Sequence, residues 1–190
     1  SETVAYGGAI RGGARRGLGI VTREAGRLTK MVEDLLEFTR IQDGRFTLQM
    51  DTINLPELVE DTLYTYSELF RQEGMEVSYT PPEEDFPDIP GDGARLSQVL
   101  LNILDNACKY GRSGKRIEVA LKMTGDAQAV SVRDHGPGIP PDELPHVKTK
   151  FDKGSSKERG NGIGLAVCEE IVSRHNGKLT IYNAEGGGLL

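Results

Sequence analysis

Two asparagines and a lysine stand out in the stretch LSQVLLNILDNACKYG, residues 96–111, because ordinary helix packing does not explain them. The apolar residues of this stretch recur at helical spacing, as expected for a helix that packs on a sheet. Asn102, Asn106 and Lys109 run beside that apolar face as a second stripe. Asparagine is a poor helix former and is rarely buried without hydrogen-bond partners. These three side chains are therefore candidates for holding a ligand.

A second candidate site lies in the segment VSVRDHGPGIP, residues 130–140, where a predicted strand ends in Asp134. Gly136 and Gly138 follow at once, and a glycine-proline turn at a strand end is common. The same arrangement also suits a flat heterocycle, because the carboxylate can accept a hydrogen bond from an exocyclic amine while the ring lies close to bare backbone. The segment leaves both interpretations open.

The third segment is GNGIGLAVCEEIV, residues 160–172, in which Gly160, Gly162 and Gly164 lead directly into a predicted helix. Unobstructed backbone N–H groups at a helix N-terminus can bind an anion. The spacing matches neither the dinucleotide fingerprint nor the P-loop. Residues 148–159 just before it carry a local excess of three positive charges. A solvated loop is the default interpretation of this run, and a lid over a polyphosphate is favoured here because the glycines follow.

Composition indicates a folded globular protein and narrows its partners. The 190 residues are 37% hydrophobic and 27% charged, with a formal net charge of -6. This charge argues against broad binding to nucleic acid or to an anionic membrane surface. No apolar run approaches the roughly 20 residues that span a bilayer, and no signal-peptide pattern is present. Cys108 and Cys168 both lie in apolar helical patterns, which predicts buried free thiols in a reducing compartment.

Residues 45–190 carry the pattern of elements that must position the three motifs. Helices are predicted over 55–71, 93–110 and 164–175, with Asn54 and Asp92 as N-caps of the first two. Strands are predicted where apolar residues alternate, around 46–50, 75–79, 117–123, 130–132 and 179–181. Strands that are apolar on one face only, with few helices, predict an α+β fold, a two-layer α/β sandwich.

Residues 1–44 form a separate helical region in this prediction. Residues 1–19 are rich in glycine and are expected to be weakly ordered or truncated. A seam of alternating four- and three-residue steps follows over 20–42, comprising Val21, Ala25, Leu28, Val32, Leu35 and Thr39. The helix either packs on its own domain or is half of a hairpin that dimerises into a four-helix bundle. The second alternative is favoured because Gln42, Asp43 and Gly44 stop the helix just before the pattern changes period.

The three motifs, in this order, resemble the N, G1 and G2 boxes of the Bergerat-fold ATPases, the superfamily of gyrase, a heat-shock chaperone, a mismatch-repair ATPase and the sensor histidine kinases. The resemblance covers about residues 45–188 and includes a lid phenylalanine, Phe151. It is strongest to the histidine kinases, because residues 23–49 look like the second helix of their dimerisation domain running into the catalytic domain.

The resemblance implies a Mg-ATP site and a role for each residue. Asn106 would offer its amide oxygen to Mg²⁺, Asn102 would support the metal and the phosphates, and Lys109 would pair with phosphate oxygens. Amides suit this place because Mg²⁺ prefers oxygen ligands, whereas further negative charge beside a triphosphate would be repelled. The remaining residues divide between the two ends of the nucleotide: Tyr110, Asp134, Gly136, Gly138 and Ile139 at the base, and Phe151, Gly160, Gly162, Gly164 and Leu165 at the phosphates.

The same resemblance leaves the phosphate acceptor unassigned. The three histidines, His135, His146 and His175, all lie outside the bundle helix where the family keeps its acceptor. We therefore expect a fragment that transfers the ATP γ-phosphate to a histidine on a helix not present in this chain, for relay to a response regulator. A degenerate pseudokinase and a Bergerat-fold ATPase remain the alternatives, although the ATPases carry a glutamate base where this chain has Asn102.

The expected setting follows from the same family. The parent protein would be a homodimer through the helical region, with ATP and a response regulator receiver domain as partners. Neither nucleic acid nor membrane contact is expected for this chain. A cytoplasmic location is predicted, and a longer parent protein could be anchored in the cell membrane.

Overall fold

The structure is a computed structural model that describes residues 46–83, 85–146 and 163–189, together with residues 25, 26, 28, 29, 32, 33, 35, 36, 39, 40 and 43. The chain divides into two compact units, residues 1–44 and 45–190. The predictions for residues 1–19 and for the basic segment 148–159 lie outside the described residues.

The described residues between 25 and 40 are helical, as the seam predicts. The hydroxyl groups of Thr29 and Thr39 donate to the carbonyl oxygens four residues earlier, which is a common bond inside helices. The apolar residues of this helix face solvent, with exposed fractions of 55%, 55%, 47% and 55% for Leu28, Val32, Leu35 and Leu36. Among the residues described in this unit, these four therefore form an apolar stripe that is about half exposed.

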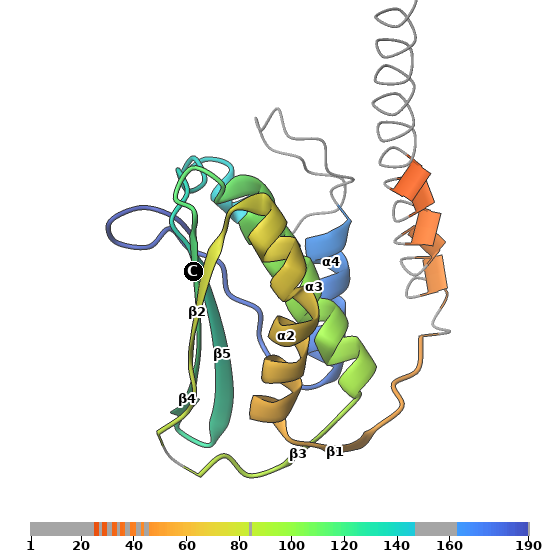
Figure 1. Cartoon of the computed structure of the whole chain (residues 1–190). Coiled ribbons are helices and arrows are strands. Elements are labelled where there is room, and N and C mark those ends of the chain that lie inside the picture. Colours follow the sequence, from red (N-terminus) through yellow and green to blue (C-terminus); the bar gives the residue numbers. More distant parts are fainter. Residues whose placement is uncertain are drawn as a thin grey trace, which may run out of the picture. The chain divides into compact units, whose positions relative to one another are not determined.

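The second unit holds all the described strands and three helices (Figure 1). Its elements are β1 (Asp51–Ile53), α2 (Leu55–Glu73), β2 (Glu76–Thr80), β3 (Ile89–Gly91), α3 (Gly93–Tyr110), β4 (Arg116–Thr124), β5 (Ala127–Asp134), the short 3₁₀ helix Leu144–His146 and α4 (Gly164–Arg174). Within the described part of the chain, no helix has both the length and the apolar character needed to cross a membrane.

The strands form two sheets. In the larger, β4 lies between β2 and β5, parallel to the former and antiparallel to the latter. In the smaller, β1 pairs with β3 in antiparallel register. Figure 1 shows α2 and α3 together against one face of the larger sheet. This is the two-layer α+β architecture predicted from the sequence.

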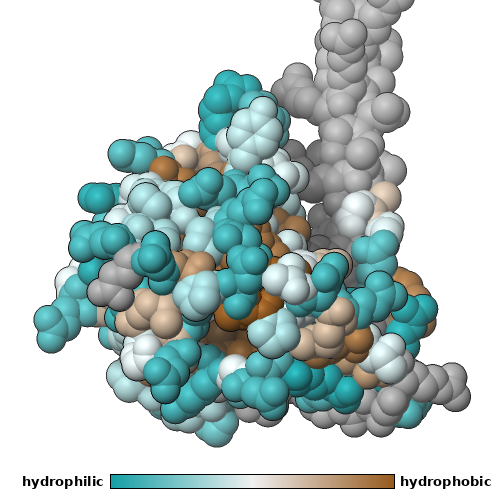
Figure 2. Space-filling view, turned by 90° about the horizontal axis from the view of Figure 1, so that it is seen from below, coloured by the Kyte–Doolittle hydropathy of each residue, from teal (hydrophilic) through white to brown (hydrophobic). Residues whose placement is uncertain are grey.

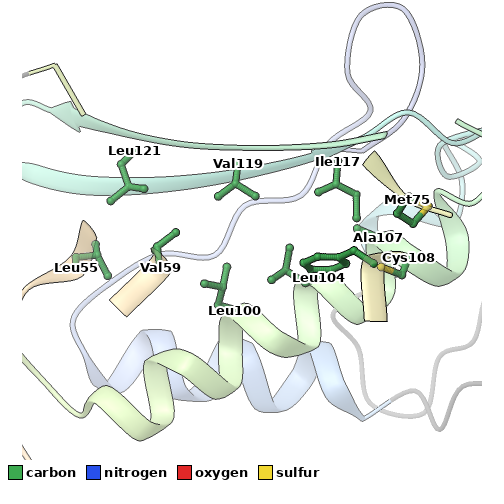
Figure 3. Packing of buried hydrophobic residues seen from close by; sticks show 11 residues of the cluster. Leu55, Val59, Met75, Leu100, Leu104, Ala107, Cys108, Ile117, Val119 and Leu121 are labelled. Carbon is green, nitrogen blue, oxygen red and sulfur yellow. The ribbon is translucent and has the colours of Figure 1, made fainter. Parts of the chain in front are cut away.

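The hydrophobic core fills the space between these two layers. Ile117, Val119 and Leu121 point from β4 toward Leu100 and Leu104 of α3 (Figure 3). Ile117 and Leu104 have no exposed surface. Full burial of one such side chain stabilises a fold by roughly 1.5–3 kcal/mol. The core therefore holds α3, the helix with the asparagine stripe, firmly on the sheet.

Local sequence sets where the helices begin and end. The side chain of Asn54 accepts a hydrogen bond from the Glu57 N–H at 3.0 Å, and α2 ends at Gly74, whose φ of 67° is left-handed. The Asp92 carboxylate likewise accepts from the Arg95 N–H at 3.1 Å and caps α3. Both N-caps were predicted from the sequence.

The strand predicted around residues 46–50 is wrong, because side chains satisfy the backbone of this segment instead of a neighbouring strand. The Phe46 carbonyl accepts from the Arg174 guanidinium at 2.8 Å, and the Gln49 N–H donates to the Asp92 carboxylate at 2.8 Å. Phe46 is buried with the guanidinium carbons of Arg95 and Arg174 at 4.8 and 5.2 Å from its ring centroid. The strand begins only at Asp51.

The strand predicted at residues 179–181 is also absent from the described structure. Residues 179–181 are not assigned to a strand, and the bridge described beyond them joins Asn183 to Leu189. Strand β3 was not predicted either, since its three residues Ile-Pro-Gly are too short to show alternation.

The surface of the second unit is mostly hydrophilic when seen from below, with hydrophobic side chains in a hollow near its middle (Figure 2).

Candidate functional site

Asn102 is buried in α3 with part of its amide unsatisfied. The residue is 8% exposed, and its Nδ2 has no hydrogen-bond partner in the described structure. An unpaired buried polar group costs about 1–3 kcal/mol. A helix of this kind retains such a residue more readily where a ligand or an ordered water supplies the missing partner.

The beginning of α4 lies beside Asn102. A Cβ atom placed on Gly164 would lie 3.9 Å from the Asn102 Cγ. Ile163 precedes the helix and caps none of its N–H groups with its side chain. Cys168 fixes the neighbouring turns, because it is fully buried and its Sγ lies 3.8 Å from the Val99 carbonyl oxygen. The middle of α3 and an uncapped helix N-terminus therefore meet at one place.

Two turns beyond Asn102 along α3, Lys109 forms an ion pair that was not predicted from the sequence. Its Nζ lies 2.6 Å from the Asp105 carboxylate. The signal was present, since charges of opposite sign four residues apart meet on a helix. Asn106 lies half-buried between these turns, and its side chain makes no hydrogen bond within the described residues.

Asp134 ends β5 with its carboxylate buried, at 5% exposure. Its Oδ1 accepts from the Gly136 N–H at 2.8 Å and from the Leu189 N–H at 3.3 Å. Its own N–H donates to the Leu189 carbonyl at 3.0 Å. The other carboxylate oxygen, Oδ2, takes no hydrogen bond from the described residues. The backbone thus holds Oδ1 in place, which makes Oδ2 the candidate atom for a ligand contact.

The end of α3 and the end of β5 approach each other so closely that only glycine fits. A Cβ atom on Gly136 would lie 2.7 Å from the Tyr110 carbonyl oxygen, and one on Gly111 would lie 2.6 Å from the Asp134 Cβ. Real Cβ atoms essentially never come within 3.0 Å of such neighbours. Tyr110 and Asp134 are consequently brought together from separate elements.

The structure places most of the predicted residues along one side of α3. Tyr110, Asp134, Gly136, Gly138 and Ile139 gather at its C-terminal end, and Gly164 and Leu165 form the first turn of α4 beside Asn102. The predicted residues Phe151, Gly160 and Gly162 lie outside the described residues.

The turn at residues 136–139, which we call the glycine turn, makes a further contact that was not predicted from the sequence. The Asn183 side chain accepts from the Ile139 N–H at 2.8 Å and donates to the Ile139 carbonyl at 2.7 Å. Forty-four residues separate the pair. No spacing rule connects them, so no signal in the sequence could have found this contact.

The histidines have surroundings that fit structural roles. His175 lies beside α3, where its Nε2 accepts from the Asp92 N–H at 2.9 Å and its Nδ1 lies 2.8 Å from the Ile171 carbonyl. The His135 Nε2 lies 3.3 Å from the Glu118 carboxylate, and His146 is exposed. Both cysteines are buried free thiols, as predicted.

A separate groove of about 440 Å³ lies between α2 and β2. Apolar side chains line most of it, and Tyr64 at its edge is 83% exposed. It contains none of the predicted site residues, so it is distinct from the site along α3.

Comparison with known proteins agrees with this geometry. Residues 91–189, just over half of the chain, match the family described as histidine kinase-, DNA gyrase B-, and HSP90-like ATPase. The sensor protein KdpD of Clostridium acetobutylicum is 32% identical over 167 residues, which are 86% of this chain and 18% of that protein. This chain therefore spans about a fifth of the length of that relative.

Solved structures show the same fold. Full-length ShkA in complex with AMPPNP matches with a TM-score of 0.76 and 26% identity, over 88% of this chain and 35% of that one. The catalytic domain of histidine kinase ThkA matches with a TM-score of 0.66 and 25% identity, over 75% of this chain and 92% of that one. The chain thus belongs to the histidine kinase-, DNA gyrase B- and HSP90-like ATPases, and within them to the ATPase domains of sensor histidine kinases.

Proposed function

We propose that this chain binds Mg-ATP along α3 and is the catalytic core that phosphorylates a histidine on a dimerisation helix outside this chain. The observation that carries the proposal is the buried Asn102, whose Nδ2 lacks a partner beside the uncapped start of α4. A helix N-terminus attracts anionic groups, and an unpaired amide beside it supplies a further donor. Both features suit phosphate oxygens.

The adenine end lies where α3 meets β5. Asp134 keeps Oδ2 available to accept from an exocyclic amino group, while Oδ1 is held by the Gly136 and Leu189 N–H groups. Because Gly136 has no side chain, a flat ring can approach the backbone closely. Tyr110 lies at the same end of α3 and would flank the base or the ribose. ShkA, a relative by structure, holds the ATP analogue AMPPNP.

The phosphate end lies between the middle of α3 and α4. Asn106 would bind Mg²⁺ through its amide oxygen and Asn102 would support it, while Lys109 would exchange part of its ion pair with Asp105 for phosphate oxygens. Bound Mg²⁺ would neutralise charge on the β- and γ-phosphates. Gly164 and Leu165, with Phe151, Gly160 and Gly162, are proposed to complete this end.

Transfer to a protein acceptor fits the residue types of the site better than hydrolysis. A histidine nitrogen of the acceptor would attack the γ-phosphorus, so that a P–N bond forms, the bond to the β–γ bridging oxygen breaks, ADP leaves and one proton passes to water. Related ATPases that activate water need a carboxylate base. Asn102 occupies that position here and cannot accept a proton.

The exposed seam of the N-terminal unit supports the proposed homodimer. Leu28, Val32, Leu35 and Leu36 are each about half exposed, and burial against a second copy would remove this apolar surface from water. The phosphorylated histidine would pass its phosphate to a response regulator receiver domain. The parent protein could be anchored in a membrane through other segments.

The test uses this chain and a longer version that includes the natural upstream sequence. Each is incubated with Mg²⁺ and ATP labelled at the γ-phosphate, and the product is treated with acid and with base. We expect ATP binding and slow hydrolysis by this chain, without self-labelling, and a label on the longer version that is lost in acid and retained in base. Rapid hydrolysis by the short chain would support the ATPase alternative. Binding of ATP without any labelling of the longer version would support the pseudokinase.

A further inference from the structure

The glycine turn after β5 is held from outside by one side chain. Both polar atoms of the Asn183 amide bond to Ile139, Oδ1 to its N–H and Nδ2 to its carbonyl, at 2.8 and 2.7 Å. This reciprocal pair satisfies a backbone donor and a backbone acceptor at once, as a strand neighbour would do. The amide therefore anchors the backbone of the turn at Ile139.

The contact also explains the glycine at position 138. Gly138 has a φ of 74°, and a Cβ atom there would lie 2.6 Å from the Asn183 Oδ1. The turn can thus pass under the amide only without a side chain. Asn183 and Gly138 together set the path of the backbone between Gly136 and Ile139.

The residues after Asn183 hold the same end of β5. The Leu189 backbone makes two hydrogen bonds with the strand end, because its N–H donates to the Asp134 carboxylate and its carbonyl accepts from the Asp134 N–H. The Arg133 guanidinium donates to the Glu185 carbonyl at 2.6 Å. We call residues 183–189 the C-terminal brace. It fixes both the carboxylate and the turn that are proposed to receive the base.

We propose that Asn183 is a positioning residue for the base of the nucleotide, acting through the Ile139 backbone without touching the ligand. This inference rests on the proposed function. Loss of the amide leaves Ile139 N–H and C=O without these partners, so the turn gains freedom beside Asp134. Adenine, whose amino group would bond to Asp134, must then order the turn as it binds, which lowers its affinity. Guanine carries a carbonyl in place of that amino group, so its binding does not use this contact.

The test compares the wild-type chain with Asn183→Ala by calorimetry, using Mg-ATP and adenosine. We expect Asn183→Ala to lose about ten-fold in affinity for each of the two ligands, because both carry the adenine base at which the defect lies. The matched control is Asn54→Ala, which also removes an asparagine with two side-chain hydrogen bonds, to Glu57 and Asp88, at the start of α2. It should lower thermal stability and leave both affinities unchanged.

A second readout separates positioning from loss of folded protein. The ratio of ATP to GTP affinity does not depend on the folded fraction, since unfolding lowers both affinities equally. We expect this ratio to fall about ten-fold in Asn183→Ala. If that variant does not fold, Asn183→Asp retains the acceptor for the Ile139 N–H, faces the Ile139 carbonyl with a second oxygen, and should show the same fall in the ratio.

The outcomes distinguish this inference from the proposed function. If the wild-type chain binds ATP and the variants keep its affinity and its ratio, the inference is wrong and the proposed function stands. If a variant is less stable but has the same ratio of ATP to GTP affinity as the wild-type chain, the role of Asn183 is likewise purely structural. Absence of ATP binding by the wild-type chain would overturn the proposed function and the inference together.

Discussion

Replacement of Asp134 by asparagine should weaken ATP binding while the fold stays intact. In the native chain, the Asp134 Oδ1 accepts from the Gly136 and Leu189 N–H groups. The other carboxylate oxygen, Oδ2, is the atom that we propose accepts from the amino group of adenine. An asparagine has only one acceptor oxygen. If that oxygen keeps the backbone bonds, the Nδ2 group faces adenine as a donor against a donor.

The size of the effect follows from the cost of one unpaired donor. A buried donor without an acceptor costs about 1–3 kcal/mol, which corresponds to about ten- to a hundred-fold in affinity. Asp134→Ala should lose the same ligand contact and also both backbone bonds. Hydrogen bonds to a charged group contribute about 1.5–3 kcal/mol, so the alanine variant should be less stable than the asparagine variant.

Calorimetry with Mg-ATP and urea unfolding of each variant measure the two effects separately. Asp88→Asn is the charge-matched control, because Asp88 is exposed and its neighbour Pro87 contacts Gln128 near the other end of β5. This control should bind ATP as the wild-type chain does. Wild-type affinity in Asp134→Asn would show that Asp134 is only a turn residue and would refute its assignment to adenine.

Three further predictions concern α3. Lys109→Ala should weaken ATP far more than adenosine in calorimetry, because only phosphate oxygens would pair with the lysine; equal losses would place Lys109 outside the site. Burial, followed by the negative charges of Asp105 and Glu73, raises the pKa of Cys108 to about 11. The native chain should therefore react with iodoacetamide at about pH 8 much more slowly at Cys108 than the urea-unfolded chain does, and equal rates by peptide mass spectrometry would contradict this. Burial alone would raise the pKa of Asp92, but backbone N–H bonds and nearby positive charges outweigh it and lower the pKa. Its contribution to stability is then present above the unfolded pKa and lost as pH falls through the lowered folded value. The stability gap between wild type and Asp92→Asn in urea should narrow from about pH 6 to about pH 3, and a constant gap would disprove this linkage.

The amino-acid sequence by itself determined the helices, the caps and the chemical nature of the site. Helical periodicity located α2 and α3, and Asn54 and Asp92 marked their first turns, since these signals act within a few residues. The asparagine stripe and the Asp134 turn could also be recognised locally. The apolar helical patterns around Cys108 and Cys168 predicted their buried free thiols.

Only the tertiary structure decided which distant groups meet. Alternation at residues 46–50 predicted a strand, but the Arg174 guanidinium and the Asp92 carboxylate take its backbone bonds from other elements. The two amide bonds between Asn183 and Ile139 likewise join residues 44 positions apart. Periodicity describes the face that a segment presents, whereas the partner on that face depends on how the whole chain packs. The sequence therefore determined which residue types make up the candidate site. Packing against β5 and α4 determined which of their atoms are held by hydrogen bonds within the described part of the chain.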